Sequence, residues 1–121
     1  MGEVNGRESV QDVDYVKIVN KSQSAIQLSF QYLQYGSLNK SVVIPAGEYR
    51  IFQRLCKIFL VTETNLFFLC DLRPSGGVYL DELADRLSPN STGPILRMAF
   101  THEPPVKGYN FIGLRITFHD K

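Results

Sequence analysis

The chain has 121 residues, of which 44% are hydrophobic and 21% are charged, and its formal net charge is +1. These values predict one globular domain, long enough to bury a core without a metal ion or a disulfide framework. The near-neutral charge argues against a nucleic-acid-binding protein, because such proteins carry a basic excess on one face. We therefore expect no nucleic-acid partner.

The first fourteen residues, MGEVNGRESVQDVD, are polar and acidic, and they predict a flexible arm. They lack the basic and apolar regions of a secretory signal. A membrane helix needs about 20 apolar residues, and no apolar run in the chain approaches that length. We expect a single folded domain over residues 15–121, a cytoplasmic location and no membrane association.

Apolar and polar residues alternate with a period of two along most of the chain, which is typical of strands with one buried face. In segment 15–20, Val16 and Ile18 share a face, and in segment 25–34 the apolar residues again fall on one side. The segment YGSLNK, residues 35–40, is expected to be a connection, and Gly47 suits a turn with positive φ. Further short strands are expected at 41–45, 49–53, 57–61, 66–72, 95–102 and 111–120.

Residues 57–72, KIFLVTETNLFFLCDL, are apolar on both faces of the strands that they predict. The polar tetrad TETN divides the stretch into two halves, each too short to cross a membrane as a helix. We interpret the stretch as a central hairpin with one face in the core and the other face covered by another element.

The period changes to that of a helix in residues 78–87, VYLDELADRL. Such a helix would place an apolar stripe on the second face of the hairpin, in contact with Phe59, Phe67 or Leu69. If that contact is absent, the remaining apolar face belongs to a partner. The stripe consists of Leu80, Leu83, Ala84 and Leu87.

These elements together predict a mainly β fold: an antiparallel β-sandwich of six or seven strands with one short amphipathic helix near 78–87. Residues 19–52, with an Asn-Lys-Ser turn, an alternating strand and a Pro-Ala-Gly turn, are similar in layout to the first hairpin of von Hippel–Lindau-type β domains. The tryptophans and the C-terminal helical domain of that family have no counterpart here. The resemblance implies a sandwich that binds other proteins.

The chain offers few residues for catalysis or metal binding. His102 and His119 lie near opposite ends of a predicted hairpin, too far apart to share a metal ion. Cys56 and Cys70 match no zinc pattern and lie in apolar surroundings, which favours unreactive buried thiols, although the sequence leaves a disulfide between them open. We expect no enzyme, no metal ion and no cofactor.

The predicted function is that of a non-catalytic protein-interaction module that uses an exposed sheet face or strand edge, with another protein or a second copy as partner. The candidate binding residues are Gln27, Gln31, Tyr35 and Tyr49, expected on one solvated face. The alternative is a membrane-active or lipid-binding β protein. Its ligand cavity would be lined by Phe59, Phe67, Phe68 and Leu69.

Overall fold

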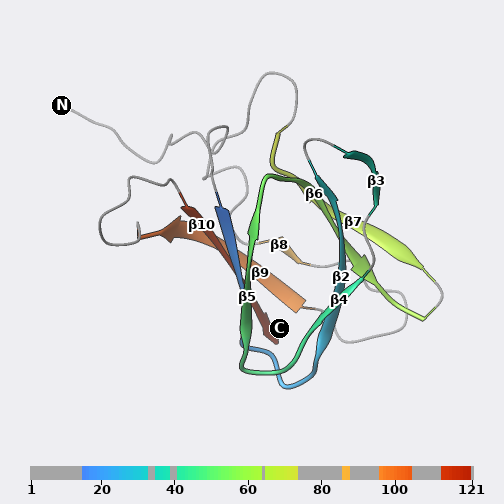
Figure 1. Cartoon of the computed structure of the whole chain (residues 1–121). Coiled ribbons are helices and arrows are strands. Elements are labelled where there is room, and N and C mark those ends of the chain that lie inside the picture. Colours follow the sequence, from blue (N-terminus) through green and yellow to red (C-terminus); the bar gives the residue numbers. More distant parts are fainter. Residues whose placement is uncertain are drawn as a thin grey trace.

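The computed structural model describes seven parts of the chain, and for 35–38 and 86–87 it describes the backbone alone. These parts are residues 15–32, 35–38, 41–63, 65–73, 86–87, 96–104 and 113–120. Their regular secondary structure consists of strands (Figure 1). The strands are β1 Tyr15–Asn20, β2 Ile26–Tyr32, β3 Tyr35–Leu38, β4 Val42–Ile44, β5 Tyr49–Gln53, β6 Leu55–Val61, β7 Leu66–Asp71, β8 Arg86–Leu87, β9 Leu96–Glu103 and β10 Gly113–Asp120.

Within the described residues, the strands form two five-stranded sheets. Sheet 1 has the order β5-β1-β10-β9-β8. Sheet 2 has the order β3-β2-β6-β7, with β4 also paired to β2. Figure 1 shows the two sheets as separate groups of strands. The expected sandwich is confirmed, because the inward residues of both sheets join in one apolar core.

The core follows the alternation of the sequence. Val16 and Ile18 of β1, Leu28 and Phe30 of β2, and Ile116 of β10 are each at most 1% exposed. The intervening residues of these strands point outward, as a pleated strand requires. A single row of apolar residues per strand was therefore sufficient to indicate which face is buried.

The sheets differ from the expectation in three respects. Strand β1 pairs in parallel with β10, although the sequence predicted an antiparallel sandwich. Strand β3 lies where residues 35–40 were expected to form a connection, and it pairs with the end of β2. The end of the predicted helix is also wrong, because Arg86 and Leu87 form β8, which pairs with β9. Residues 78–85, where that helix would begin, and the predicted arm 1–14 lie outside the described residues.

Buried Asn20, at the end of β1, connects the two sheets. Its Nδ2 donates to the carbonyl oxygens of Ser24 at 2.8 Å and of Ile44 in β4 at 2.9 Å. Its Oδ1 accepts from the main-chain N–H and the hydroxyl of Ser22. The amide group is fully hydrogen-bonded, so it can be buried at 0% exposure without an unpaired polar atom. Nearby, Gly47 has the expected positive φ of 81°.

The predicted hairpin of residues 57–72 is confirmed as β6 and β7, which pair side by side in sheet 2. The register shifts between Ile58 and Phe59, so that Leu69 is an additional residue on β7. Ile58 and Cys70 point into the core at 0% exposure. Phe59 and Phe68, paired across the two strands, lie on the outer face of the sheet.

Candidate functional site

The outer face of sheet 2 carries a group of apolar side chains that we call the apolar face. It is defined by Val43 of β4, Phe59 and Val61 of β6, and Leu66 and Phe68 of β7. Val43 is 50% exposed, Leu66 46% and Phe68 52%, whereas Phe59 and Val61 are half-buried. Scattered exposed apolar residues are normal on a protein surface, but neighbouring ones across adjacent strands indicate a contact surface.

The register of sheet 2 shows that the four members on β6 and β7 are neighbours, whereas Val43 lies beyond β2, where it pairs with Gln27. Phe59 pairs with Phe68 and Val61 pairs with Leu66. The rings of Phe59 and Phe68 meet edge to face, with their centroids 5.8 Å apart. This geometry is favourable for aromatic pairs and holds the half-exposed ring of Phe68 in a defined position. The apolar face is therefore an ordered surface rather than a set of independent side chains.

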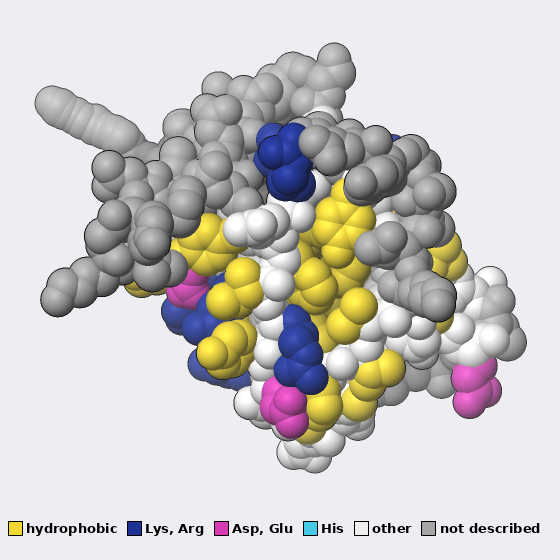
Figure 2. All heavy atoms as spheres, in the orientation of Figure 1, with side chains coloured by type: hydrophobic (Ala, Val, Ile, Leu, Met, Phe, Trp, Pro, Cys, Tyr) yellow, Lys and Arg dark blue, Asp and Glu magenta, His cyan; other side chains and the backbone are white. Residues whose placement is uncertain are grey.

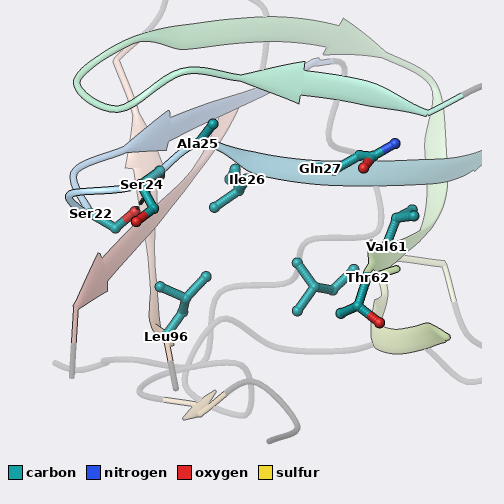
Figure 3. A pocket seen from close by; sticks show the side chains of 9 residues that line it. Ser22, Ser24, Ala25, Ile26, Gln27, Val61, Thr62 and Leu96 are labelled. Atoms are coloured by element: carbon teal, nitrogen blue, oxygen red, sulfur yellow. Dashed lines mark hydrogen bonds between the residues drawn. The ribbon is translucent and has the colours of Figure 1, made fainter. Parts of the chain in front are cut away.

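A shallow cavity of about 200 Å³ adjoins the apolar face at the end of the sandwich. Gln27 and Val61 border the cavity, and Val61 also belongs to the apolar face (Figure 3). Its inner wall is formed by Ile26 and Leu60 of sheet 2 and Leu96 of sheet 1, which are at most 9% exposed. The rim carries the polar side chains of Ser24 and Thr62, whereas Ser22 in the lining is buried at 4% exposure. An opening with an apolar base and a polar rim suits one aliphatic side chain of a partner.

The candidate binding residues do not share one face. Gln27 and Gln31 lie on β2 with their side chains half-buried, and Gln27 Nε2 donates to Ser41 Oγ at 2.6 Å. Tyr35 lies on β3 in the same sheet, and its side chain is outside the description. Tyr49, however, lies on β5 in sheet 1 and is 52% exposed. The sequence placed them together because local alternation cannot show to which sheet a strand belongs.

The apolar residues of the 57–72 hairpin form most of the apolar face, which does not include any of the four candidate binding residues. Leu66 was not a candidate residue, and Phe68 was named only for the lining of the alternative lipid cavity, yet both are about half exposed next to Phe59. Their signal was an apolar run on both faces of a strand. Leu87 of the proposed covering helix pairs through β8 with Arg97 in sheet 1, so it belongs to the other sheet. Leu80 and Leu83 lie outside the described residues.

The lining expected for a lipid cavity is not assembled. Phe59 and Phe68 lie on the outer face of sheet 2, whereas Phe67 packs against the core and Leu69 is buried at 6% exposure. None of these four residues borders the cavity at the end of the sandwich. Among the residues that the structure describes, no helix is long and apolar enough to cross a membrane.

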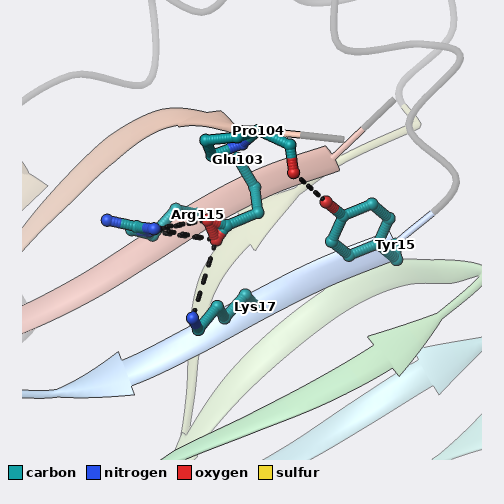
Figure 4. Close-up of polar contacts among 5 residues, drawn as sticks. All are labelled: Tyr15, Lys17, Glu103, Pro104 and Arg115. Atoms are coloured by element: carbon teal, nitrogen blue, oxygen red, sulfur yellow. Dashed lines mark hydrogen bonds and ion pairs between the residues drawn. The ribbon is translucent and has the colours of Figure 1, made fainter. Parts of the chain in front are cut away.

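A second cluster, of charged residues, lies on the outer face of sheet 1 (Figure 4). The Glu103 side chain is 7% exposed, and its carboxylate accepts hydrogen bonds from Nε of Arg115 at 3.1 Å and from Nη2 of the same guanidinium. Lys17 Nζ lies 3.9 Å from Glu103 Oε2. Because these residues come from β9, β10 and β1, the cluster ties three adjacent strands together. Its buried carboxylate is paired, as burial of a charge requires.

Tyr15 completes this cluster and donates from its hydroxyl to the Pro104 carbonyl oxygen at 2.7 Å. Burial raises the pKa of Tyr15, and the Glu103 carboxylate raises it further, while the Arg115 charge acts in the opposite direction. The hydrogen bonds to Glu103 raise the pKa of Arg115. Both shifts favour the neutral phenol of Tyr15 and the charged guanidinium of Arg115.

The cysteines and histidines, which could act as nucleophiles or metal ligands, do not form a cluster. Cys56 and Cys70 are free thiols, half-buried and buried respectively. His102 pairs with Leu114 and His119 with Arg97, at different levels of the β9–β10 ladder, as the hairpin prediction required. The described parts of the chain contain no group of three or more His, Cys, Asp or Glu side chains that could hold a metal ion.

Comparison with known proteins adds no relative from which a function could be transferred. No family model, no curated protein and no solved structure matches the chain. The candidate function must therefore be argued from the surfaces of the molecule.

Proposed function

We propose that this protein is a non-catalytic interaction module that binds another protein chain, or a second copy of itself, through the apolar face of sheet 2. The observation that carries the proposal is the paired, half-exposed ring of Phe68, flanked by Leu66 on the same strand. Aromatic residues at the centre of a contact surface contribute a large part of binding energy when a partner excludes water from them.

The cavity beside the apolar face supports the same proposal. A partner that lies across Val61 can place one aliphatic side chain against Leu60 and Leu96. Such an anchor in a pocket gives a contact surface its specificity, while the flatter apolar face supplies area. The half-buried Gln27 at the boundary offers a polar contact at the rim.

The test compares the wild type with the substitution Phe68→Ser by light scattering at protein concentrations from about 10 to 300 µM, the range in which weak interfaces dissociate. We expect the wild type to self-associate and Phe68→Ser to remain monomeric at every concentration. Tyr49→Ser, which removes a similarly exposed ring from sheet 1, is the matched control and should associate as the wild type does.

If the apolar face binds a different protein, the test uses the wild type, Phe68→Ser and Tyr49→Ser, each immobilised to retain that partner. A partner retained by the wild type and by Tyr49→Ser, but not by Phe68→Ser with an unchanged circular dichroism spectrum, supports the proposal. The proposal is contradicted if the wild type stays monomeric and every retained partner binds Phe68→Ser as well as it binds the wild type.

A further inference from the structure

The free edge of β5 in sheet 1 is a second feature with the properties of a binding site. Asn20 N donates to Glu48 O at 2.9 Å, in register with the pairs Ile18–Arg50 and Val16–Phe52. Hydrogen-bonded and non-hydrogen-bonded pairs alternate along an antiparallel ladder. The main-chain groups of Arg50 and Phe52 are therefore directed to β1, and those of Tyr49, Ile51 and Gln53 are directed away from it.

The residues with outward main-chain groups also have exposed side chains. Ile51 is 56% exposed and Tyr49 52%, and Lys17 Nζ lies 4.3 Å from the centroid of the Tyr49 ring. Arg50 Nη1 donates to the Tyr49 carbonyl oxygen at 2.8 Å, which protects one acceptor of the edge. Among the described residues, β5 has no neighbour on the side away from β1, so Ile51 and Gln53 present their N–H and C=O groups to a new strand.

The charge around this edge is predominantly positive. In residues 15–20 and 48–54, the cations are Lys17, Arg50 and Arg54, and the single carboxylate is Glu48. Outside these ranges, Glu103 faces Lys17 at 3.9 Å and is already paired with Arg115. Glu48 Oε1 already pairs with Arg50 Nη1 at 3.2 Å. Figure 2 shows Lys or Arg side chains towards both ends of β5 and hydrophobic side chains beside it. The edge is thus complementary to a segment with apolar residues in its middle and acidic residues at its ends.

We propose that the edge of β5 binds an extended acidic segment of a partner protein, which adds to sheet 1 as a further strand. The segment exchanges main-chain hydrogen bonds with Ile51 and Gln53. It places apolar side chains beside Tyr49 and Ile51 and carboxylates near Arg50 and Arg54. Main-chain pairing supplies affinity in this mode of recognition, and the side chains supply the preference for sequence. This site is separate from the apolar face of sheet 2 and does not depend on it.

The proposal is tested with the full-length, ¹⁵N-labelled protein and two capped peptides, EVTVEVE and its lysine counterpart KVTVKVK. We expect the acidic peptide to bind and the basic peptide to bind at least about tenfold more weakly, with the difference decreasing as salt is added. Hydrogen exchange gives the geometric readout. The amides of Ile51 and Gln53 should exchange at least about tenfold more slowly in the complex, whereas those of Arg50 and Phe52 are bonded to β1 already and should change little.

Three variants locate the site. Ile51→Pro removes the outward N–H without breaking a bond to β1, and it should abolish binding. Arg54→Glu should weaken binding of the acidic peptide about fivefold or more and improve binding of the basic one. Phe68→Ser, on the apolar face, should leave peptide binding unchanged, so this test can fail independently of the proposed function.

Several results would overturn the proposed β5 site. They are equal binding of the two peptides, no binding of the acidic peptide at millimolar concentration, and binding that leaves the exchange of Ile51 and Gln53 unaltered. If Ile51→Pro fails to fold, Arg54→Glu and the exchange measurement on the wild type still decide the matter.

Discussion

At the scale of single residues, the close contact between Gly113 and Tyr15 shows why the start of β10 is a glycine. The two residues pair across β1 and β10. A Cβ on Gly113 would lie 2.7 Å from Cε1 of the Tyr15 ring, which is closer than carbon atoms approach without displacement. The ring is held in place by burial and by its hydrogen bond to Pro104. The glycine is required by this neighbour and not by a special backbone conformation.

Gly113→Ala should lower the free energy of unfolding by about 1–3 kcal/mol, because the buried ring must move and its hydrogen bond to Pro104 is strained. Urea unfolding followed by circular dichroism measures the change. In a Tyr15→Leu background the same substitution should cost less than half as much. An equal cost in both backgrounds would show that the ring is not the cause.

At the scale of elements, Arg54 forms the turn at which the chain passes from β5 in sheet 1 to β6 in sheet 2. It is the single residue between β5 in sheet 1 and β6 in sheet 2, and its φ is 61°. Among the described residues it is the only one other than glycine with a positive φ. A left-handed conformation costs an L-residue roughly 1–2 kcal/mol, and Arg is not one of the residues, such as Asn and Asp, whose short polar side chains favour it. The strained residue produces the sharp change of direction that places Phe52 and Leu55 in the same core.

Arg54→Gly should raise the free energy of unfolding by about 0.5–1 kcal/mol, because glycine adopts this conformation without strain although it adds entropy to the unfolded chain. Arg54→Val should lower it by about 1–2 kcal/mol. Thermal unfolding of the three proteins provides the order of stability. Gln53→Gly is the control: in a strand the same change should destabilise, and a stabilising effect there would refute the argument from φ.

At the scale of the whole molecule, β10 is the strand on which the fold depends. It lies inside sheet 1 between β1 and β9, and its inward residues Leu114, Ile116 and Phe118 are each 0% exposed. Strand β5 lies at the edge of the same sheet, and its outward residue Ile51 is 56% exposed. The contribution of a residue to stability should therefore depend on the position of its strand in the sheet.

Ile116→Ala should lower the free energy of unfolding by about 2–5 kcal/mol, because it leaves a cavity between the sheets. Ile51→Ala makes the same chemical change at the edge and should cost less than about 0.5 kcal/mol. Chemical denaturation of both variants is the measurement. A comparable loss in the two would mean that β5 is buried in solution, which would also argue against a free edge.

Local patterns were sufficient to predict most strands and several of their details. Alternation identified β1, β2, β9 and β10, since the two-residue period is a property of each strand alone. The apolar stretch divided by TETN identified β6 and β7. The hairpin of β6 and β7 and the turn at Gly47 also followed from neighbouring residues. For the candidate site, the apolar run in residues 66–69 indicated a second apolar face on the hairpin, but the sequence assigned that face to a covering helix at 78–87 rather than to the binding residues.

The pairing of strands and the exposure of particular apolar side chains could not be predicted from local patterns. The parallel pair of β1 and β10, the separation of Tyr49 from Gln27 and the change of sheet at Arg54 all depend on contacts between distant segments. A period of two shows that one face of a strand is buried, but it is the same whichever strand lies alongside. Local patterns thus specified the strands, their inner faces and the β6–β7 hairpin that carries most of the apolar face, because these depend on neighbouring residues. Pairing between distant segments placed β5 at the edge of sheet 1, because β5 must pair with β1.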